Sequence, residues 1–161
     1  MTGNTDTFEG GCTCRHVRYR LTSKPMWVNA CHCTWCQRET GGAFATNAMI
    51  EADRVELTSG APEPIDTASA SGKGQKIWRC PKCRVAVWSN YAGAGDQVRF
   101  VRVGTLDAGH GIAPDIHIFT STKLPWVVLP PGTPAVPEYY TPKEVWPAES
   151  QARFAALKAK A

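Results

Sequence analysis

Short alternations of apolar and polar residues set the pattern along most of the chain. Val17, Tyr19 and Leu21 alternate with Arg18 and Arg20, which is typical of a half-buried β-strand. The 14 glycines and 12 prolines among the 161 residues recur at short intervals, and this distribution favours strands and loops over long helices. The pattern therefore predicts a mainly β protein.

The other predicted strands are short runs of apolar or β-branched residues closed by turn residues. They cover residues 43–50, 54–58, 75–79, 85–88, 98–103, 115–120 and 126–129. Within the fifth of these runs the alternation slips between Phe100 and Val101, which predicts a β-bulge. The stretch 61–74 is rich in Pro, Ser, Ala and Gly, so it is predicted to be a mobile loop.

The C-terminal part of the chain has a different pattern. Thr141 is followed by Pro142, with Glu144 three residues after the threonine, and this order is the signature of a helix start. Residues 149–161 are rich in Ala and Lys and are predicted to be helical, with Phe154 and Leu157 as the anchoring residues. The predicted β protein therefore ends in a short helical tail.

Composition and charge narrow the class of protein. About 43% of the residues are hydrophobic and 20% are charged, and 161 residues suit one domain with a sizeable core. No apolar run approaches the roughly 18 residues of a membrane span, and residues 1–8 are polar without a signal-peptide core. The net charge of +4 comes from scattered residues rather than from the clustered stripe of a nucleic-acid-binding protein. We therefore expect a cytoplasmic protein that binds neither nucleic acid nor membranes.

The seven cysteines carry the most information about function. They form three groups, which are Cys12 with Cys14, then Cys31 with Cys33 and Cys36, then Cys80 with Cys83. An odd number of cysteines cannot pair completely into disulfides within one chain. In the absence of a secretory signal, metal binding or catalysis is the better interpretation of this grouping.

Two partitions of these cysteines around zinc are open, because zinc with thiolate ligands prefers four-coordinate tetrahedral geometry. In the first, the two pairs form a closed tetrad (Cys12, Cys14, Cys80 and Cys83), which leaves an open triplet (Cys31, Cys33 and Cys36). In the second, the triplet borrows from one pair and the other pair stays unused. The first uses every cysteine and gives one closed and one open site, the division expected between structural and catalytic zinc.

A different interpretation makes the triplet a second structural site whose fourth ligand is a histidine. His32 is the nearest candidate in the sequence, and the others are His16, His110 and His117. Three functions then stand beside one another: a zinc enzyme that acts on a thiol, a zinc-stabilised binding module, and a thiolate cluster that senses redox state or metal. An open site favours the enzyme, a fourth protein ligand favours the module, and a labile metal with a disulfide favours the sensor.

The motifs together resemble one known family. They are Gly10-Gly11-Cys12-Thr13-Cys14, Cys31-His32-Cys33-Thr34-Trp35-Cys36-Gln37-Arg38, Gly41-Gly42-Ala43-Phe44, Cys80-Pro81-Lys82-Cys83, His117-Ile118-Phe119 and Lys123-Leu124-Pro125-Trp126. This string, from about Phe8 to Leu129, resembles the glutathione-dependent formaldehyde-activating family, also called the centromere-protein-V/GFA domain. The sequence departs from the family after the last cysteine, where Arg84-Val85 stands in place of the usual Gly-Thr.

The resemblance implies a fold, two metal sites and an activity. The fold is a β-tent of packed antiparallel sheets over residues 8–130, preceded by a flexible N-terminus (residues 1–7) and followed by a partly helical extension (residues 131–161). A structural zinc would bind the tetrad, and a catalytic zinc, which we expect to be the more labile one, would bind the triplet. The activity is a carbon–sulfur lyase reaction that adds glutathione to formaldehyde and gives S-hydroxymethylglutathione. A small thiol such as glutathione and a small aldehyde are therefore the expected partners.

The chemistry of an open zinc site agrees with this activity. A thiol bound at the fourth position of the triplet zinc is deprotonated and becomes a nucleophile. Arg38, Lys123 and Arg84 offer positive charge for the carboxylates of glutathione. Trp35 and Phe44 could form aromatic walls of the pocket, and His32 and His117 could move protons. Of these we predict that Arg38, Phe44, His117 and Lys123 contact the substrate.

Overall fold

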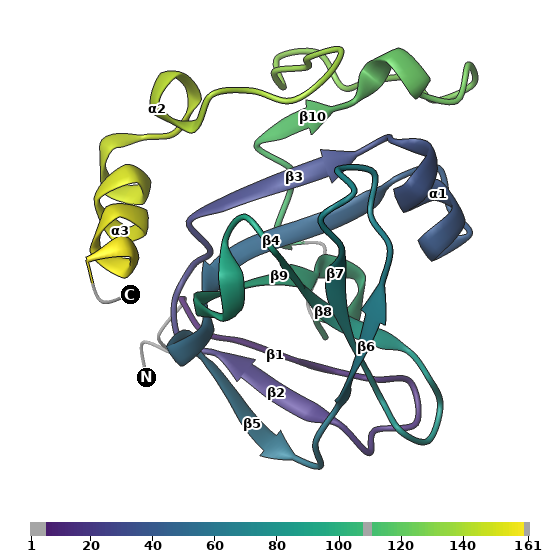
Figure 1. Cartoon of the computed structure of the whole chain (residues 1–161), viewed down its shortest axis with the longest axis vertical. Helices are drawn as coiled ribbons and strands as arrows, with labels where there is room; N and C mark the ends of the chain where they lie inside the picture. Colours follow the sequence, from purple (N-terminus) through teal and green to yellow (C-terminus); the bar gives the residue numbers. More distant parts are fainter. Residues whose placement is uncertain (1–5, 108–110, 160–161) are drawn as a thin grey trace.

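The computed structural model describes residues 6–107 and 111–159. The elements of this part are β1 (Phe8–Gly11), β2 (Arg18–Leu21), β3 (Trp27–Cys31), α1 (Thr34–Thr40), β4 (Ala45–Glu51), β5 (Val55–Ser59), β6 (Glu63–Thr67), β7 (Gln75–Arg79), β8 (Ala86–Tyr91), β9 (Val98–Arg102), β10 (Ile116–Ile118), α2 (Pro142–Val145) and α3 (Ala148–Lys158). The predicted mainly β architecture with short C-terminal helices is confirmed (Figure 1). Residues 1–7 are expected to be flexible, but residues 1–5 lie outside the described part of the chain. Residues 160–161 of the predicted helical tail lie outside it as well.

The strands form two sheets. The small sheet has the order β1-β2-β5, and the large sheet has the order β10-β3-β4-β9-β8-β7-β6. Pairing is antiparallel as expected, except that β10 lies parallel to β3, with Ile116 opposite Asn29 and Ile118 opposite Cys31. This parallel pair places His117 and Ile118 directly beside β3, the strand that ends in Cys31, the first cysteine of the triplet.

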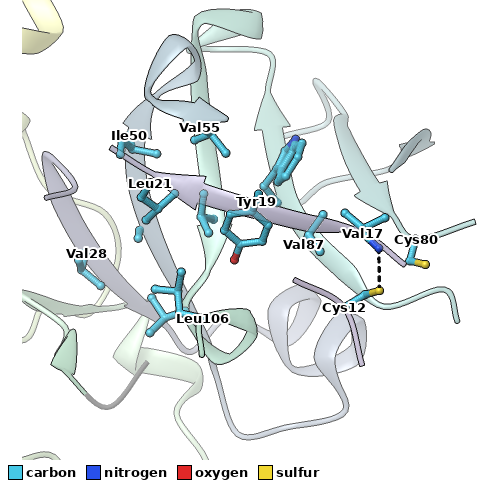
Figure 2. Packing of buried hydrophobic residues seen from close by; sticks show 14 residues of the cluster. Cys12, Val17, Tyr19, Leu21, Val28, Ile50, Val55, Cys80, Val87 and Leu106 are labelled. Atoms are coloured by element: carbon cyan, nitrogen blue, oxygen red, sulfur yellow. Dashed lines mark hydrogen bonds between the residues drawn. The ribbon is translucent and has the colours of Figure 1, made fainter. Parts of the chain in front are cut away.

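A first core fills the space between the two sheets (Figure 2). The alternation along β2 points Tyr19 and Leu21 inward, where both side chains are fully buried. The Tyr19 ring meets the Trp88 ring of the large sheet edge-on, with ring centroids 5.7 Å apart. Cys12 and Cys80 belong to this core, so one end of it is formed by the tetrad.

A second core lies on the other face of the large sheet. In β4, Ala45 and Met49 belong to this second core, whereas Ala48 and Ile50 belong to the first. Cys31 and Cys36 are part of the second core. The two cysteine groups thus lie in different cores.

Strand β9 is regular, so the predicted bulge at Phe100 and Val101 is wrong. Its register with β4 runs without a break from Glu51 opposite Val98 to Asn47 opposite Arg102. Phe100 packs on the second core and Val101 lies in the first. Apolar residues therefore stand next to one another in the sequence because both faces of this central strand are covered, not because the strand bulges.

The chain after β10 covers the second core. The Tyr140 hydroxyl donates to Asn29 Oδ1 over 2.9 Å, and Trp146 Nε1 donates to the Tyr140 hydroxyl over 3.0 Å. Arg153 binds the buried Glu51 carboxylate with two bonds of 2.8 and 2.6 Å. These contacts hold α2 and α3 beside β3 and β4 (Figure 1). We call residues 131–159 the strap.

The structure confirms the predicted helix start at Thr141 and the predicted anchoring residues of the C-terminal helix. Thr141 occupies the N-cap position of α2, although its side chain makes no capping hydrogen bond. In α3, Leu157 is buried and Phe154 packs against the second core. Within the described part of the chain, no helix combines the length and the apolar composition that crossing a membrane requires.

Two other predictions about local structure are wrong. Residues 61–74 contain the edge strand β6, which pairs with β7. Its side chains are almost all exposed, so the sequence shows no alternation there, and Pro64 is tolerated because an edge strand leaves N–H groups unpaired. Residues 126–129 form no strand, because Pro125 begins a turn and the side chains of Trp126 and Val128 are 72% and 88% exposed.

Candidate functional site

The tetrad is assembled from the turns that join β1 to β2 and β7 to β8. The four sulfur atoms of Cys12, Cys14, Cys80 and Cys83 lie within 4.8 Å of one another. Two of the separations are 3.5 Å, from Cys12 Sγ to Cys14 Sγ, and 3.7 Å, from Cys14 Sγ to Cys80 Sγ. Four thiolates about 2.3 Å from a central zinc would be about 3.8 Å apart. The spacing and the donor set therefore fit a tetrahedral metal ion.

Backbone N–H groups in the two turns point at the sulfurs. The N–H of Val17 donates to Cys12 Sγ over 3.3 Å (Figure 2), and that of Lys82 donates to Cys80 Sγ over 3.4 Å. Hydrogen bonds from the N–H of Val85 and then of Cys14 lower the pKa of the Cys83 thiol to about 6. These bonds stabilise thiolates, the form in which cysteine binds metals.

Both turns end in a residue with left-handed backbone. Arg15 has φ 62° and Arg84 has φ 64°. This explains the departure noted in the sequence: Arg84 stands where the resembled family usually has glycine, and a left-handed conformation is one that glycine adopts without steric cost. The Arg84 N–H donates to the Cys80 carbonyl over 3.0 Å, which closes the turn.

Replacing Arg84 with glycine is expected to stabilise the protein by about 1 kcal/mol, because the left-handed conformation costs a side-chain-bearing residue roughly 1–2 kcal/mol. Two smaller losses oppose this gain: an exposed ion pair with Glu63 at 3.4 Å, and the greater freedom of glycine in the unfolded chain. Arg84→Ala is the matched control, because it removes the ion pair and keeps the strain. Urea unfolding of both variants checks the expectation, and equal stability of the two would contradict it.

The triplet is local and lies where β3 passes into α1. Cys31 ends β3, Cys33 is the N-cap residue of α1, and Cys36 is in its first turn. Their sulfurs lie within 4.8 Å of one another, and the N–H of Cys36 donates to Cys33 Sγ over 3.3 Å. Hydrogen bonds from Cys31 and then Cys36 lower the pKa of the Cys33 thiol to about 2, while the pKa of the Cys31 thiol is raised by hydrogen bonding with Cys33 and Cys36 and by burial. The three sulfurs could hold a metal ion.

No histidine or carboxylate joins the three sulfurs within that distance, as far as the described residues go. This holds for His16, His32 and His117, while His110 lies outside the described residues. The interpretation of the triplet as a closed site with a histidine ligand therefore gains no support from the described part of the chain.

His32 and His117 form a buried pair behind the triplet. His32 Nε2 and His117 Nδ1 are 2.9 Å apart, so one proton is shared between two neutral rings. Burial, followed by the charges of His117 and Lys123, lowers the pKa of His32 to about 4, and burial lowers that of His117. The Phe44 ring packs against both imidazoles, with centroids 4.8 Å from His32 and 6.2 Å from His117.

A loop after β10 fixes the backbone of His32. The Gln37 side-chain amide donates to the carbonyls of His32 and Thr122 over 2.8 and 2.9 Å, and the Thr122 hydroxyl donates to the same His32 carbonyl over 3.1 Å. The Lys123 ammonium donates to the carbonyls of Val127 and Leu124 over 2.7 and 3.2 Å. In this structure Lys123 therefore holds its own loop together.

A cleft of about 420 Å³ begins next to the triplet. It is lined by Glu39, Thr40, Phe44, Ala45, Thr46, Arg79, Ala86, Arg102 and Gly104. Ala45 is the strand partner of Cys31, and the Thr40 hydroxyl donates to the Cys36 carbonyl over 2.8 Å. Of the four predicted substrate contacts, Phe44 lines this cleft; Arg38 is exposed on α1, and His117 is buried beside His32.

Sequence reasoning did not single out Arg79 and Arg102, the two cations of the cleft. Arg79 directly precedes Cys80, and Arg102 lies inside the most apolar run of the chain. An arginine within such a run is an informative signal, because a buried charge needs a partner or a function.

Comparison with known proteins adds the following findings. A family model described as glutathione-dependent formaldehyde-activating enzyme matches residues 7–122. A curated protein of Halomonas elongata, named "Putative glutathione-dependent formaldehyde-activating enzyme", is 32% identical over 85 residues, which make up 50% of this chain and 54% of that protein. The match thus spans about half the length of the relative. A crystal structure of a Rhodobacter sphaeroides protein superposes with a TM-score of 0.46 at 18% identity, covering 66% of this chain and 97% of the other, and carries no further argument.

Proposed function

The chain belongs to the glutathione-dependent formaldehyde-activating family, and on that premise we propose that it is a zinc-dependent carbon–sulfur lyase that joins a thiol such as glutathione to formaldehyde or another small aldehyde. One observation carries the proposal. Three cysteine sulfurs lie together beside a cleft, and no fourth protein ligand joins them within the described residues. Zinc prefers four ligands, so such a site has room for the sulfur of a substrate.

In this proposal the tetrad would hold a structural zinc and the triplet a second, more exchangeable one. Zinc bound by three thiolates supplies a position at which a thiol loses its proton and stays nucleophilic. The tetrad would have no position left for a substrate, which suits a purely structural role. Both groups need reduced thiols, and all seven cysteines are free in the structure, so the proposal places the enzyme in the cytoplasm.

The reaction needs no oxidant or reductant. A bond forms between the thiol sulfur and the carbonyl carbon, the π electrons of the carbonyl move to its oxygen, and that oxygen takes up the proton that the thiol has lost. The product is the S-hydroxymethyl thioether, and the reverse reaction releases the thiol and the aldehyde.

The residues of the chain would position the thiol for this addition. Phe44 lines the cleft and packs on His32 and His117, so it forms the border between the substrate and the histidine pair. His117, Arg38 and Lys123 stay proposed substrate contacts. The binding-module alternative calls for a fourth protein ligand at the triplet, which the described residues do not supply.

Native mass spectrometry with and without glutathione, together with the rate of S-hydroxymethylglutathione formation followed by NMR, tests the proposal. We expect two zinc ions per chain, one of which exchanges and is perturbed by glutathione, and a rate above that of the uncatalysed addition. A single tight zinc that does not respond to glutathione, with no acceleration of the reaction, would refute it.

A further inference from the structure

A buried guanidinium faces the cleft without a carboxylate of its own. Arg102 is 8% exposed and lines the cleft next to Ala45 and Phe44. Its Nη1 donates to Asn47 Oδ1 over 2.5 Å and its Nη2 donates to the Ser89 hydroxyl over 3.1 Å, and both acceptors are neutral. Among the described residues, no carboxylate oxygen lies within 4.0 Å of this guanidinium. A buried cation in this situation is costly unless an anion compensates it.

Strand register places Arg102 on the face of the large sheet that carries the triplet. Arg102 is opposite Asn47 in the β4–β9 pair, and Cys31 is opposite Ala45 in the β3–β4 pair, so these side chains share one face. Ala45, the strand partner of Cys31, lines the cleft together with Arg102. Arg102 therefore faces the cleft that begins beside the triplet.

The other cation of the cleft is already neutralised. Arg79 forms an ion pair with Glu39 of α1, and its Nη1 donates to the Arg84 carbonyl over 3.1 Å. Among the described residues, the cleft therefore has one arginine without a carboxylate partner, Arg102, and a second arginine, Arg79, whose carboxylate partner competes with any bound anion. The two hydrogen bonds of Arg102 use two of its five N–H groups, which leaves donors for a ligand.

We propose that Arg102 binds a carboxylate of the thiol substrate in this cleft, so that the enzyme selects anionic, carboxylate-bearing thiols over neutral ones. The inference rests on the proposed function, because it names the occupant as the substrate of the triplet. A guanidinium is suited to a carboxylate, since the two planar groups can form parallel charge-assisted hydrogen bonds. A volume of about 420 Å³ is within the range of pockets for small ligands and suits a tripeptide thiol.

S-Methylglutathione tests the inference without chemistry at sulfur, because it keeps both carboxylates and lacks a thiol. We expect isothermal titration calorimetry to detect its binding to the zinc-loaded protein, and its diethyl ester to bind at least tenfold more weakly. Equal binding of the acid and the ester, or no binding of the acid, would overturn the inference.

Two substitutions in the cleft are expected to change the affinity for S-methylglutathione in opposite directions. Arg102→Gln is expected to weaken S-methylglutathione binding about 10- to 100-fold, because it removes a charged hydrogen-bond donor. Glu39→Gln is expected to tighten binding about threefold, because Arg79 loses its competing carboxylate, and a gain in affinity cannot arise from misfolding. Arg20→Gln, at an exposed position of β2, is the matched control and should bind as the wild type does. Unchanged affinity in Arg102→Gln would overturn the inference, whatever Glu39→Gln does.

The same measurements separate this inference from the proposed function. If formaldehyde is not turned over but S-methylglutathione binding depends on Arg102 and Glu39, the carboxylate site stands and the proposed reaction fails. If turnover is present but binding ignores both residues, the reaction stands and the carboxylate site fails. The zinc content of each variant is measured in parallel. It shows whether Arg102 binds the ligand or only balances the charge of the thiolates. Loss of zinc without loss of S-methylglutathione binding would overturn the inference.

Discussion

Replacing Cys33 with alanine is expected to abolish thiol addition to formaldehyde while leaving a folded protein with one zinc per chain. Cys33 is half-buried at the start of α1. The triplet joins residues only five positions apart, so a metal bound there closes only a short loop and contributes little to the stability of the fold. The start of α1 is also held by the Gln37 side chain on the His32 and Thr122 carbonyls. Loss of a direct ligand should cost more than the roughly 10- to 100-fold typical of outer-shell changes at metal sites.

The rate by NMR, the zinc content and the far-ultraviolet circular dichroism spectrum together check this expectation. Thr34→Ala is a suitable control, because Thr34 lies between the ligand positions and its side chain is exposed. Wild-type turnover in Cys33→Ala would contradict the catalytic role of the triplet. Loss of fold as complete as that of the next variant would contradict the division between the two metal sites.

Replacing Cys83 with alanine is expected to unfold the protein. The tetrad ties Cys14 to Cys80, which are 66 positions apart, and so joins a turn of the small sheet to a turn of the large one. Binding of zinc to four thiolates is worth about 10–16 kcal/mol in small zinc-binding peptides, which is comparable with the whole stability of a domain, about 5–15 kcal/mol. A site with three ligands and an open edge toward solvent would lose most of that energy.

Thermal unfolding followed by circular dichroism, with and without a chelator, measures this effect. Cys83→Ala should show no cooperative transition, and chelation should bring the wild type to the same state. Lys82→Ala, in the same turn, should keep a transition near that of the wild type, because its contribution to the turn is a backbone N–H. A cooperative transition at the wild-type temperature in Cys83→Ala would rule out a structural role for the tetrad.

The cysteine groups could be predicted because their signal is local. Spacings such as Cys31-x-Cys33-x-x-Cys36 place ligands on one turn whatever the rest of the chain does, and the structure brings each group together as the spacing indicated. Strands with one covered face, such as β2, were visible for the same reason. Edge strand β6 is missed because its side chains are almost all exposed, so no alternation marks it. The apolar run at 126–129 is misleading because it lies between Pro125 and Pro130 and has no partner strand in the described sheets.

The cleft could not be predicted, because it depends on pairing between distant strands. Arg79 and Arg102 are 23 positions apart in the sequence and line one cleft because β7, β8 and β9 are neighbours in the large sheet. Strand β3 is likewise not predicted from the sequence, because the residues that pack on it include Tyr140 of the strap, more than 100 positions later. Long-range register of this kind is set by the whole fold rather than by any local pattern.

The strap completes the surroundings of the triplet later in synthesis than those of the tetrad. During synthesis the last tetrad cysteine, Cys83, has emerged well before Tyr140 and Leu157, which complete the core around Cys31 and Cys36. Segments nearer the N-terminus leave the ribosome first and are therefore the first that can make contacts with one another. The tetrad can therefore capture metal on a partial chain, whereas the triplet acquires its finished surroundings only once residues 140–157 have docked. The nascent protein is thus expected to pass through a state in which the tetrad can hold metal while the surroundings of the triplet are still incomplete.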